Sequence, residues 1–545
     1  MILESFKGQM FLNGKIIDNK QCFYLIPSNH QEYSFEKDQC NVDNERQYIK
    51  ISEAGIMINT SWFGELPLFY FTKDDYFVVS SSFERLLLKL KEKHLDALDF
   101  DRTAIFESMI FDNPLRARTL FKNISKTLPG KKISINAMTL NVSEESTFIL
   151  PFDKGSADFN KKHFLDEATE ILKKLSMSFA SFKTGEVLLP LSGGLDSRLL
   201  ACLLSKNNIP YSSITFGPKE STEPYIAKKV AKQLDIPIVH LELKNDYYRT
   251  YGDAVTWLTG GLSSPMHCHL YAVLSANQVY SDNIVHGYLG DVYAGASQPE
   301  HACNYSMSED DALHSFIVKY LAPKWVWSQL STKDKDAIIN DLKEIMTENC
   351  QCNLPCHFEE YVHNVDRQFS LIANIFSPIE AFGHVIRPFA SKEYAIFFNS
   401  LPYELRKDRR LFVEAATSLF PEVFKIGTQN QIYKSQHFIG KIEKQVSSLM
   451  SKLSYESLLI TKGKFVIHNP KSFERHRELL QLELNNYLTK SISEISELLD
   501  MDITNLGLNS RKNRRQVISQ YRVLSLSRFI DGINSNKIGI TRRCT

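Results

Sequence analysis

Short apolar runs separated by polar turns characterise the first 150 residues. The runs Leu66–Phe71 and Tyr76–Val79 flank a polar turn, which predicts a β-hairpin. Apolar spacing then predicts a helix from Phe83 to Leu90, and Ile133–Asn136 is predicted to be a further strand. This part of the chain is therefore expected to form two-layered β structure with some helix.

From about residue 160 the pattern changes to alternating helices and strands. Apolar positions in Phe164–Leu175 share one helical face, and Val187–Leu191, Tyr211–Phe216 and Pro237–Leu241 are predicted strands separated by helices. Such alternation produces a parallel sheet with helices on its faces, so the predicted fold class is α/β. Beyond about residue 300 the pattern is mainly helical, as far as a last helix at Arg514–Ile530.

The length of 545 residues is too great for one compact core, so at least two domains are expected. The change of pattern divides the chain into an α+β layer domain at 1–150 and a second domain at 160–545. The formal net charge of +1 favours neither nucleic acid nor an anionic membrane as a partner. The basic run Arg511–Arg515 could bind an acidic partner, but such a run is more often a solvated face.

The chain has no apolar run long enough to cross a bilayer, and Met1–Ser5 lacks the basic start of a signal peptide. Nine scattered cysteines fit a reduced, cytoplasmic protein better than a disulfide framework. One group of them could bind zinc, but its C-x-C-x3-C-H spacing lacks the usual C-x2-C pairs, so reduced and unliganded cysteines are favoured. The group comprises Cys350, Cys352, Cys356 and His357, with His363 just beyond.

A glycine-containing loop follows the first predicted parallel strand. It consists of Leu191, Ser192, Gly193, Gly194, Leu195, Asp196 and Ser197. Its glycines allow the backbone to approach a phosphate, and its hydroxyls and the free N–H groups of the next helix are suitable donors to phosphate oxygens. Asp196 would repel a phosphate, so it is interpreted as a magnesium ligand that faces pyrophosphate through the metal. The alternative is a strand–helix turn with an N-capping aspartate.

This loop resembles the pyrophosphate loop of the N-type ATP pyrophosphatases, and more narrowly that of the asparagine synthetase branch. His286–Asp291 is similar to the second loop of that family, T-G-x-G-x-D, and Arg387–Phe389 to a later R-x-P-F element. The resemblance covers about residues 160 to 425 and implies Mg²⁺ binding by Asp196 and Asp291. It implies ATP binding by Leu191, Ser192, Gly193, Gly194, Asp196, Ser197, Thr215, Phe216, Gly217, Gly287 and Tyr288.

The N-terminal part resembles the glutaminase-type domain of the same family. Gly64–Tyr70 is similar to its G-x-x-P-L-Y-Y segment, and Ser80–Leu87 to its A-S-E-x-K-A-L segment. A working glutaminase of this class needs cysteine directly after the initiator methionine, whereas this chain has Ile2, and its first cysteine is Cys22. The glutaminase half is therefore predicted to be inactive.

Tyr288 stands where asparagine synthetases have glutamate, and this departure resembles β-lactam synthetase. The resemblance implies a base that deprotonates the attacking amine, for which a phenol needs a carboxylate partner such as Glu380 or Glu359. The alternative is that Tyr288 only forms a wall of the adenylate pocket. Glu380 is retained with Tyr288 as a candidate catalytic residue.

Arg409, followed by Arg410, stands where the family usually has a lysine that stabilises the adenylate transition state. Arginine keeps the positive charge but changes the geometry. Lys407 and Lys425 are alternatives for the same role.

These features predict a ligase that forms an acyl-adenylate from ATP and passes the acyl group to an amine of the substrate. The resemblance to β-lactam synthetases and lasso-peptide macrolactam cyclases implies a peptide or small-molecule substrate that carries both a carboxylate and an amine. A processing protease or leader-binding protein is the kind of partner that this implies. Three alternatives are an asparagine-forming enzyme that uses free ammonia, a tRNA-sulfurating pyrophosphatase and a non-catalytic ATP-binding scaffold.

Overall fold

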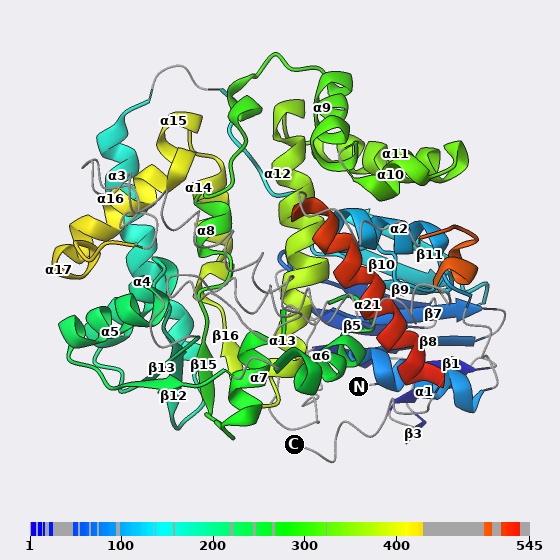
Figure 1. The fold of residues 1–545 in the computed structure, drawn as a ribbon, viewed down its shortest axis with the longest axis horizontal. Helices are drawn as coiled ribbons and strands as arrows, with labels where there is room; N and C mark the ends of the chain where they lie inside the picture. The colour runs from blue at the N-terminus through cyan, green and yellow to red at the C-terminus, as the bar shows by residue number, and fades with distance from the viewer. Residues whose placement is uncertain are drawn as a thin grey trace, which may run out of the picture.

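The computed structural model describes residues 47–428 with gaps at 53–54, 65–66, 74–75, 94–98, 137, 156–158, 218–221, 244–246, 264–266 and 323. It also describes 2–6, 9–12, 15–16, 21–24, 495–503 and 514–534. Three sheets organise these residues, two in the N-terminal part and one after residue 186 (Figure 1). Most of the basic run Arg511–Arg515 lies outside the described residues.

Two antiparallel sheets form the N-terminal part. The first has the order β3-β2-β1-β8-β7-β9, with bounds Lys15–Ile16, Gln9–Leu12, Ile2–Phe6, Tyr76–Ser80, Phe69–Lys73 and Ile124–Lys126. The second has the order β11-β10-β6-β5-β4, with bounds Val142–Ser146, Lys131–Asn136, Gly55–Asn59, Tyr48–Ser52 and Gln21–Tyr24. The predicted hairpin is β7–β8, and the predicted layered β structure is confirmed.

Strand β8 is buried along its whole length because both of its faces are covered. Phe77 and Val79 pack in a small cluster with residues of the second sheet, such as Ile58 and Ile133. Val78, on the opposite face, belongs to the main core with α1 (Phe83–Glu92) and α2 (Arg102–Phe111). A sheet covered on both faces explains why this strand is a continuous apolar run instead of an alternating one.

The third sheet is parallel and confirms the α/β fold class. Its order is β14-β13-β12-β15-β16, with bounds Ile238–Leu241, Ser212–Phe216, Val187–Pro190, Asn283–Val285 and His384–Ile386. Helices α3, α4 and α5 lie on the left in Figure 1 with this sheet, at Lys161–Lys174, Asp196–Lys206 and Thr222–Leu234. The sequence predicted β12, β13 and β14, but not the short strands β15 and β16.

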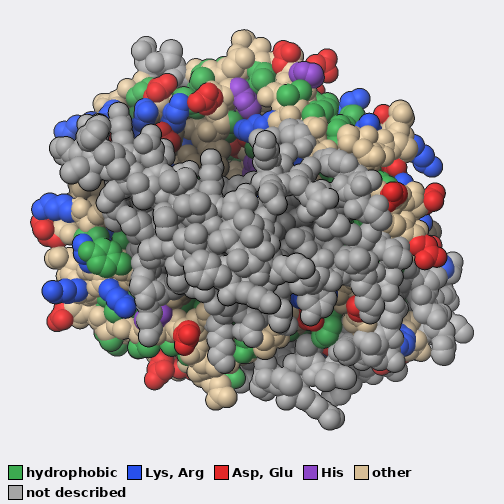
Figure 2. Space-filling view, viewed as in Figure 1, with side chains coloured by type: hydrophobic (Ala, Val, Ile, Leu, Met, Phe, Trp, Pro, Cys, Tyr) green, Lys and Arg blue, Asp and Glu red, His purple; other side chains and the backbone are tan. Residues whose placement is uncertain are grey.

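The rest of the described chain is mainly helical, as predicted. These helices are α6 (Tyr247–Leu258), α7 (His269–Ala276), α8 (Gly290–Tyr293), α9 (Glu309–Phe316), α10 (Trp325–Gln329), α11 (Thr332–Asn349), α12 (Phe358–Val362), the π-helix η6 (His363–Ala373), α13 (Asn374–Ile379), α14 (Lys392–Asn399), α15 (Tyr403–Arg406), α16 (Arg410–Leu419), α17 (Pro421–Phe424) and α21 (Arg514–Asn534). None of the helices in the described part is both long and apolar enough to cross a membrane. On the described part of the face in Figure 2, acidic and basic side chains are interspersed.

The last helix, α21, joins the N-terminal part to the parallel-sheet part. It packs against both α2 and α6 and is drawn in red in Figure 1. The buried Arg522 donates from Nε to the Asp112 carboxylate at 2.7 Å and from its terminal nitrogens to the carbonyls of Gly261 and Leu262. Burial would raise the pKa of Asp112, but Arg522 and His267 hold it at about 2.

Replacing Arg522 with Met is expected to lower the free energy of unfolding by about 3–5 kcal/mol, because Asp112 would remain buried without its guanidinium. Chemical denaturation at pH 7 measures this loss. Lys161→Met is the control, since its ion pair with Glu414 is exposed on both sides and is expected to contribute about 1 kcal/mol or less. Because the folded pKa of Asp112 lies below its unfolded value, its contribution is present above pH about 4 and is lost as the pH falls toward 2. An equal loss in both variants would contradict the assignment.

Candidate active site

The first loop joins β12 to α4 at the carboxyl edge of the parallel sheet, where α/β folds bind ligands. The Ser192 and Ser197 hydroxyls lie 3.0 Å apart, and the backbone N–H groups of Ser192 and Gly194 donate to them. The hydroxyls therefore also close the loop, a role that the sequence analysis did not assign to them. A side chain on Gly193 would come within 3.2 Å of the α5 backbone, so this glycine is needed for close packing.

The second loop follows β15, which pairs with β12, so the two loops lie at adjacent strand ends. A Cβ on Gly287 would lie 3.0 Å from the Cβ of Asp196, and one on Gly290 would lie 2.6 Å from its Oδ1. Both glycines are thus required by the close approach of this loop to Asp196. Burial, together with the negative charge of the nearby Asp291, raises the pKa of Asp196 to about 6, although Arg409 opposes the shift.

Arg409 reaches the first loop from a distant part of the sequence. Its guanidinium forms an ion pair with the Asp196 carboxylate, and its Nε is buried without a partner among the described residues. Asp408 and Arg409 both have left-handed backbone conformations, at φ 54° and 63°, which are costly for residues other than glycine. The two other candidates point elsewhere: Lys407 lies over the Tyr403 ring, and Lys425 pairs with Glu422.

The donor set suits Mg²⁺. Asp196 keeps 18% of its side chain exposed, and Asp291 is exposed, so both carboxylates are accessible to a ligand. Carboxylate oxygens are the donors that Mg²⁺ prefers, and phosphate oxygens and water usually complete its shell. Gly287 and Gly290 let the second loop approach Asp196 closely, and Asp291 is near enough to raise the pKa of Asp196.

The predicted adenine-side segment ends β13, beside the first loop. Thr215 is buried and Phe216 is half-buried, while the Leu191 N–H donates to a β13 carbonyl at 2.8 Å. Gly217 has a φ of 113°, which favours glycine, and its carbonyl oxygen lies 2.9 Å from Nε2 of His240. The residues assigned to ATP by resemblance therefore lie at the ends of three adjacent strands, β13, β12 and β15.

A comparison with known protein families gives a match in the part of the chain that contains both loops. The model of the family described as asparagine synthase matches residues 181–332, which include both loops. The match supports placing this segment in the asparagine synthase family. A search of curated proteins found no match.

A glutamine phosphoribosylpyrophosphate (PRPP) amidotransferase from B. subtilis, solved in complex with ADP and GMP, is similar at 11% sequence identity. The similarity has a TM-score of 0.12, and it covers 46% of this chain and 44% of that chain. This chain therefore spans less than half the length of that protein. A TM-score this low supports no conclusion about the fold or the ligand.

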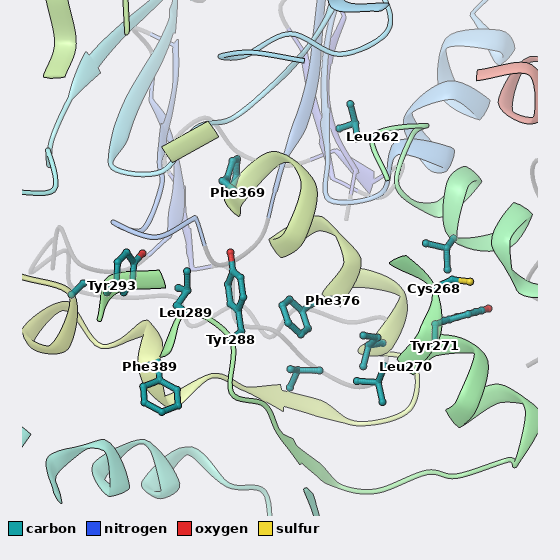
Figure 3. Packing of buried hydrophobic residues seen from close by; sticks show 14 of the residues in the cluster. Leu262, Cys268, Leu270, Tyr271, Tyr288, Leu289, Tyr293, Phe369, Phe376 and Phe389 are labelled. Carbon is teal, nitrogen blue, oxygen red and sulfur yellow. The ribbon is translucent and has the colours of Figure 1, made fainter. Parts of the chain in front are cut away.

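Tyr288, in the second loop, contacts the helical segment that runs from η6 into α13. Figure 3 shows its ring beside Phe376, with the hydroxyl directed toward the helix that carries Phe369. The hydroxyl donates to the Gln368 carbonyl at 2.8 Å, and burial raises the pKa of the phenol well above its usual value, although Arg387 partly opposes the shift. A raised pKa is the opposite of what a base at neutral pH requires.

The expected carboxylate partners of Tyr288 were wrong. Glu380 accepts a hydrogen bond from the Val385 N–H at 3.2 Å and lies beside His384. Glu359 binds Lys319 and Tyr320, each at 2.6 Å. The structure therefore uses both carboxylates elsewhere: Glu380 lies in the turn after α13, and Glu359 lies in α12.

Two residues that support the loops were missed by the sequence analysis. Arg198 is fully buried and donates to the Gly193 carbonyl at 3.3 Å and to the carbonyl of Ile426, so it braces the first loop. Leu289 falls where the T-G-x-G-x-D pattern has its second glycine, and its φ of 73° explains that preference. Comparison with that pattern could have identified Leu289, whereas the burial of Arg198 has no local sequence signal.

The members of the cysteine and histidine group at Cys350–His363 have different contact partners. Among the described residues, no group of three or more His, Cys, Asp or Glu side chains is arranged to hold a metal ion. Nε2 of His357 lies 2.7 Å from the Asp153 carbonyl, and that of His363 lies 3.1 Å from the Tyr320 hydroxyl. Cys350, Cys352 and Cys356 are free thiols.

Proposed function

We propose that this protein is an ATP-dependent ligase that forms an amide bond through an acyl-adenylate. The observation that carries the proposal is the meeting of Asp196, Asp291 and Arg409 at the ends of β12 and β15. One part-buried cation and two carboxylates beside a helix N-terminus suit the polyphosphate of a nucleotide and its metal. The asparagine synthase match of residues 181–332 supports the same reaction class.

The first step is adenylation. An oxygen of the substrate carboxylate attacks the α-phosphorus of ATP, and the bond between that phosphorus and the bridging oxygen breaks to release pyrophosphate. The N–H groups at the start of α4 and the unpartnered Nε of Arg409 are the donors that stabilise the developing negative charge. Mg²⁺ held by Asp196 and Asp291 would neutralise pyrophosphate.

The second step forms the amide. A neutral amine attacks the acyl carbon, the carbon–oxygen bond to AMP breaks, and the amine nitrogen gives one proton to water. We assign the amine to the substrate and not to ammonia from glutamine, because Tyr288 stands where asparagine synthetases have glutamate and resembles the β-lactam synthetase pattern. This assignment favours intramolecular closure of a peptide or a small molecule. An asparagine-forming enzyme that uses free ammonia is the second candidate, favoured by the family match.

The products test this proposal. With a substrate that carries both a carboxylate and an amine, the enzyme is expected to release AMP and pyrophosphate in equal amounts. Chromatography of the nucleotides, with an enzymatic assay for pyrophosphate, measures both. Release of ADP and phosphate instead would rule out adenylation.

Tyr288→Phe is expected to reduce amide formation and ATP–pyrophosphate exchange to the same small extent, less than about 10-fold, because it removes one hydrogen bond to Gln368. The two assays are run on the same preparation of the variant. A selective loss in amide formation of about 100-fold would instead identify the phenol as the base.

A further inference from the structure

A cavity of about 460 Å³, its open mouth included, lies between the N-terminal part and the second loop. Trp62, Phe63, Phe148 and Leu150 line it from the N-terminal part, and Tyr288, Leu289 and Tyr293 line it from the second loop and α8. The opposite wall is the segment that runs from α12 into η6, including Tyr361, Asn364, Val365 and Phe369.

The N-terminal wall is held in place by one tight contact. Gly64 has a φ of 65°, and a Cβ there would lie 2.0 Å from a ring carbon of Phe369. The turn that carries Trp62 and Phe63 therefore packs directly on η6. The Trp62 ring lies 5.8 Å from that of Phe148 and 6.2 Å from that of Tyr293, so the wall spans both parts of the molecule.

The lining is largely aromatic and electrically balanced. Its acidic residue, Glu348, is already bound by Lys131 at 2.7 Å and by the Tyr361 hydroxyl at 2.7 Å. The amide nitrogen of Asn364 is buried and has no hydrogen-bond partner among the described residues. A buried donor without a partner is costly unless a ligand supplies the acceptor. The lining thus suits an apolar side chain next to a carbonyl oxygen.

The second loop connects this cavity to the candidate active site. Gly287 and Gly290 contact Asp196, while Tyr288 and Leu289, between them, line the cavity. The same short loop therefore approaches Asp196 and lines the cavity. A substrate segment seated in the cavity would lie close to a carboxylate activated at Asp196.

We propose that this cavity binds an apolar, preferably aromatic, side chain of a peptide substrate, and that Asn364 donates to a backbone carbonyl of the same segment. The N-terminal part would then act in substrate recognition through Trp62 and Phe148. This inference rests on the proposed function for its place in catalysis, but binding at the cavity needs neither ATP nor Asp196.

The test uses the full-length protein without nucleotide and two probes, N-acetylphenylalaninamide and N-acetylglycinamide. Ligand-observed NMR titration is expected to give a dissociation constant of about 1 mM for the aromatic probe and binding at least about 10-fold weaker for the glycine probe, which lacks the benzyl group. Phe148→Ala removes part of the wall and Val365→Phe fills space in the cavity. Each is expected to weaken binding of the aromatic probe at least about 5-fold.

Tyr280→Ala, which removes a half-exposed ring that is not part of the cavity lining, is the control and should leave binding unchanged. Thermal melting confirms that each variant is folded, and Val365→Phe keeps the test valid if Phe148→Ala does not fold. The same affinity in all variants, equal binding of the two probes, or no binding to the wild type would overturn the proposal. Failure of ATP–pyrophosphate exchange with normal probe binding would overturn only the proposed function.

Discussion

Asp291→Asn and Asp196→Asn are each expected to lower ATP–pyrophosphate exchange by at least about 1000-fold, because each removes one of two carboxylates assigned to the metal that neutralises pyrophosphate. Exchange of labelled pyrophosphate into ATP at saturating Mg²⁺ measures adenylation alone. Asp282→Asn, in the turn before β15, is a matched control that keeps the same change of charge and should retain activity. Near-normal exchange in either variant at low Mg²⁺ would show that its carboxylate is only structural.

Stability should separate the two variants. Asp196→Asn leaves the part-buried guanidinium of Arg409 without its ion-pair partner, whereas Asp291 is exposed and its replacement should be nearly neutral. We expect Asp196→Asn to lower the free energy of unfolding more than Asp291→Asn does, although burial of the Asp196 charge offsets part of the ion pair's contribution. The double variant Asp196→Asn/Arg409→Met should regain much of this loss without regaining activity. Chemical denaturation of the wild type, Asp196→Asn, Arg409→Met and the double variant completes the double-mutant cycle. Equal stability of Asp196→Asn and Asp291→Asn would contradict the ion pair.

Arg409→Met is expected to lower adenylation by about 100- to 1000-fold, the range typical of removing one preorganised donor to a developing charge. Its guanidinium is the cation in contact with Asp196, and its free Nε can donate to phosphate. Arg409→Lys should recover only part of the rate, because an ammonium cannot reproduce the planar arrangement of donors. Single-turnover formation of AMP measures the chemical step in both variants.

Lys407→Met is the control for Arg409, since Lys407 lies two residues before Arg409 but contacts the Tyr403 ring instead of Asp196. It should retain at least about half of the wild-type rate, as surface substitutions usually do. If Lys407→Met lost as much activity as Arg409→Met, the effect of Arg409→Met would reflect disruption of the turn and not loss of the guanidinium that contacts Asp196.

The sequence alone was sufficient for the elements whose signals are local. Continuous apolar runs identified β8, β12, β13 and β14, and helical spacing identified α3 and α21. The turn residues of Leu191–Ser197 identified the first loop, since glycine and aspartate at a strand–helix junction report on backbone conformation within a few residues. The α/β class followed from the order of these elements.

Strands β15 and β16 escaped prediction because three residues are too few to show a period. Their pairing depends on the surfaces buried by the whole sheet. That pairing places the second loop beside the first and thereby brings Asp291 near Asp196. The contact between the loops could therefore be expected from resemblance, but only the folded sheet shows which glycines permit it.

Side-chain partners at long range were decided by tertiary structure. Arg409 and Asp196 are 213 residues apart, and Asp408 and Arg409 both have left-handed backbone conformations, whereas the sequence favoured Arg409 and left two lysines as alternatives. The same limit explains the wrong partners of Tyr288: residue type shows that a phenol could bind a carboxylate, but not that a backbone carbonyl of η6 lies closer. Local patterns determine backbone elements and their order, while packing of the complete chain determines which side chains meet, because burial free energy is gained only when distant surfaces come together.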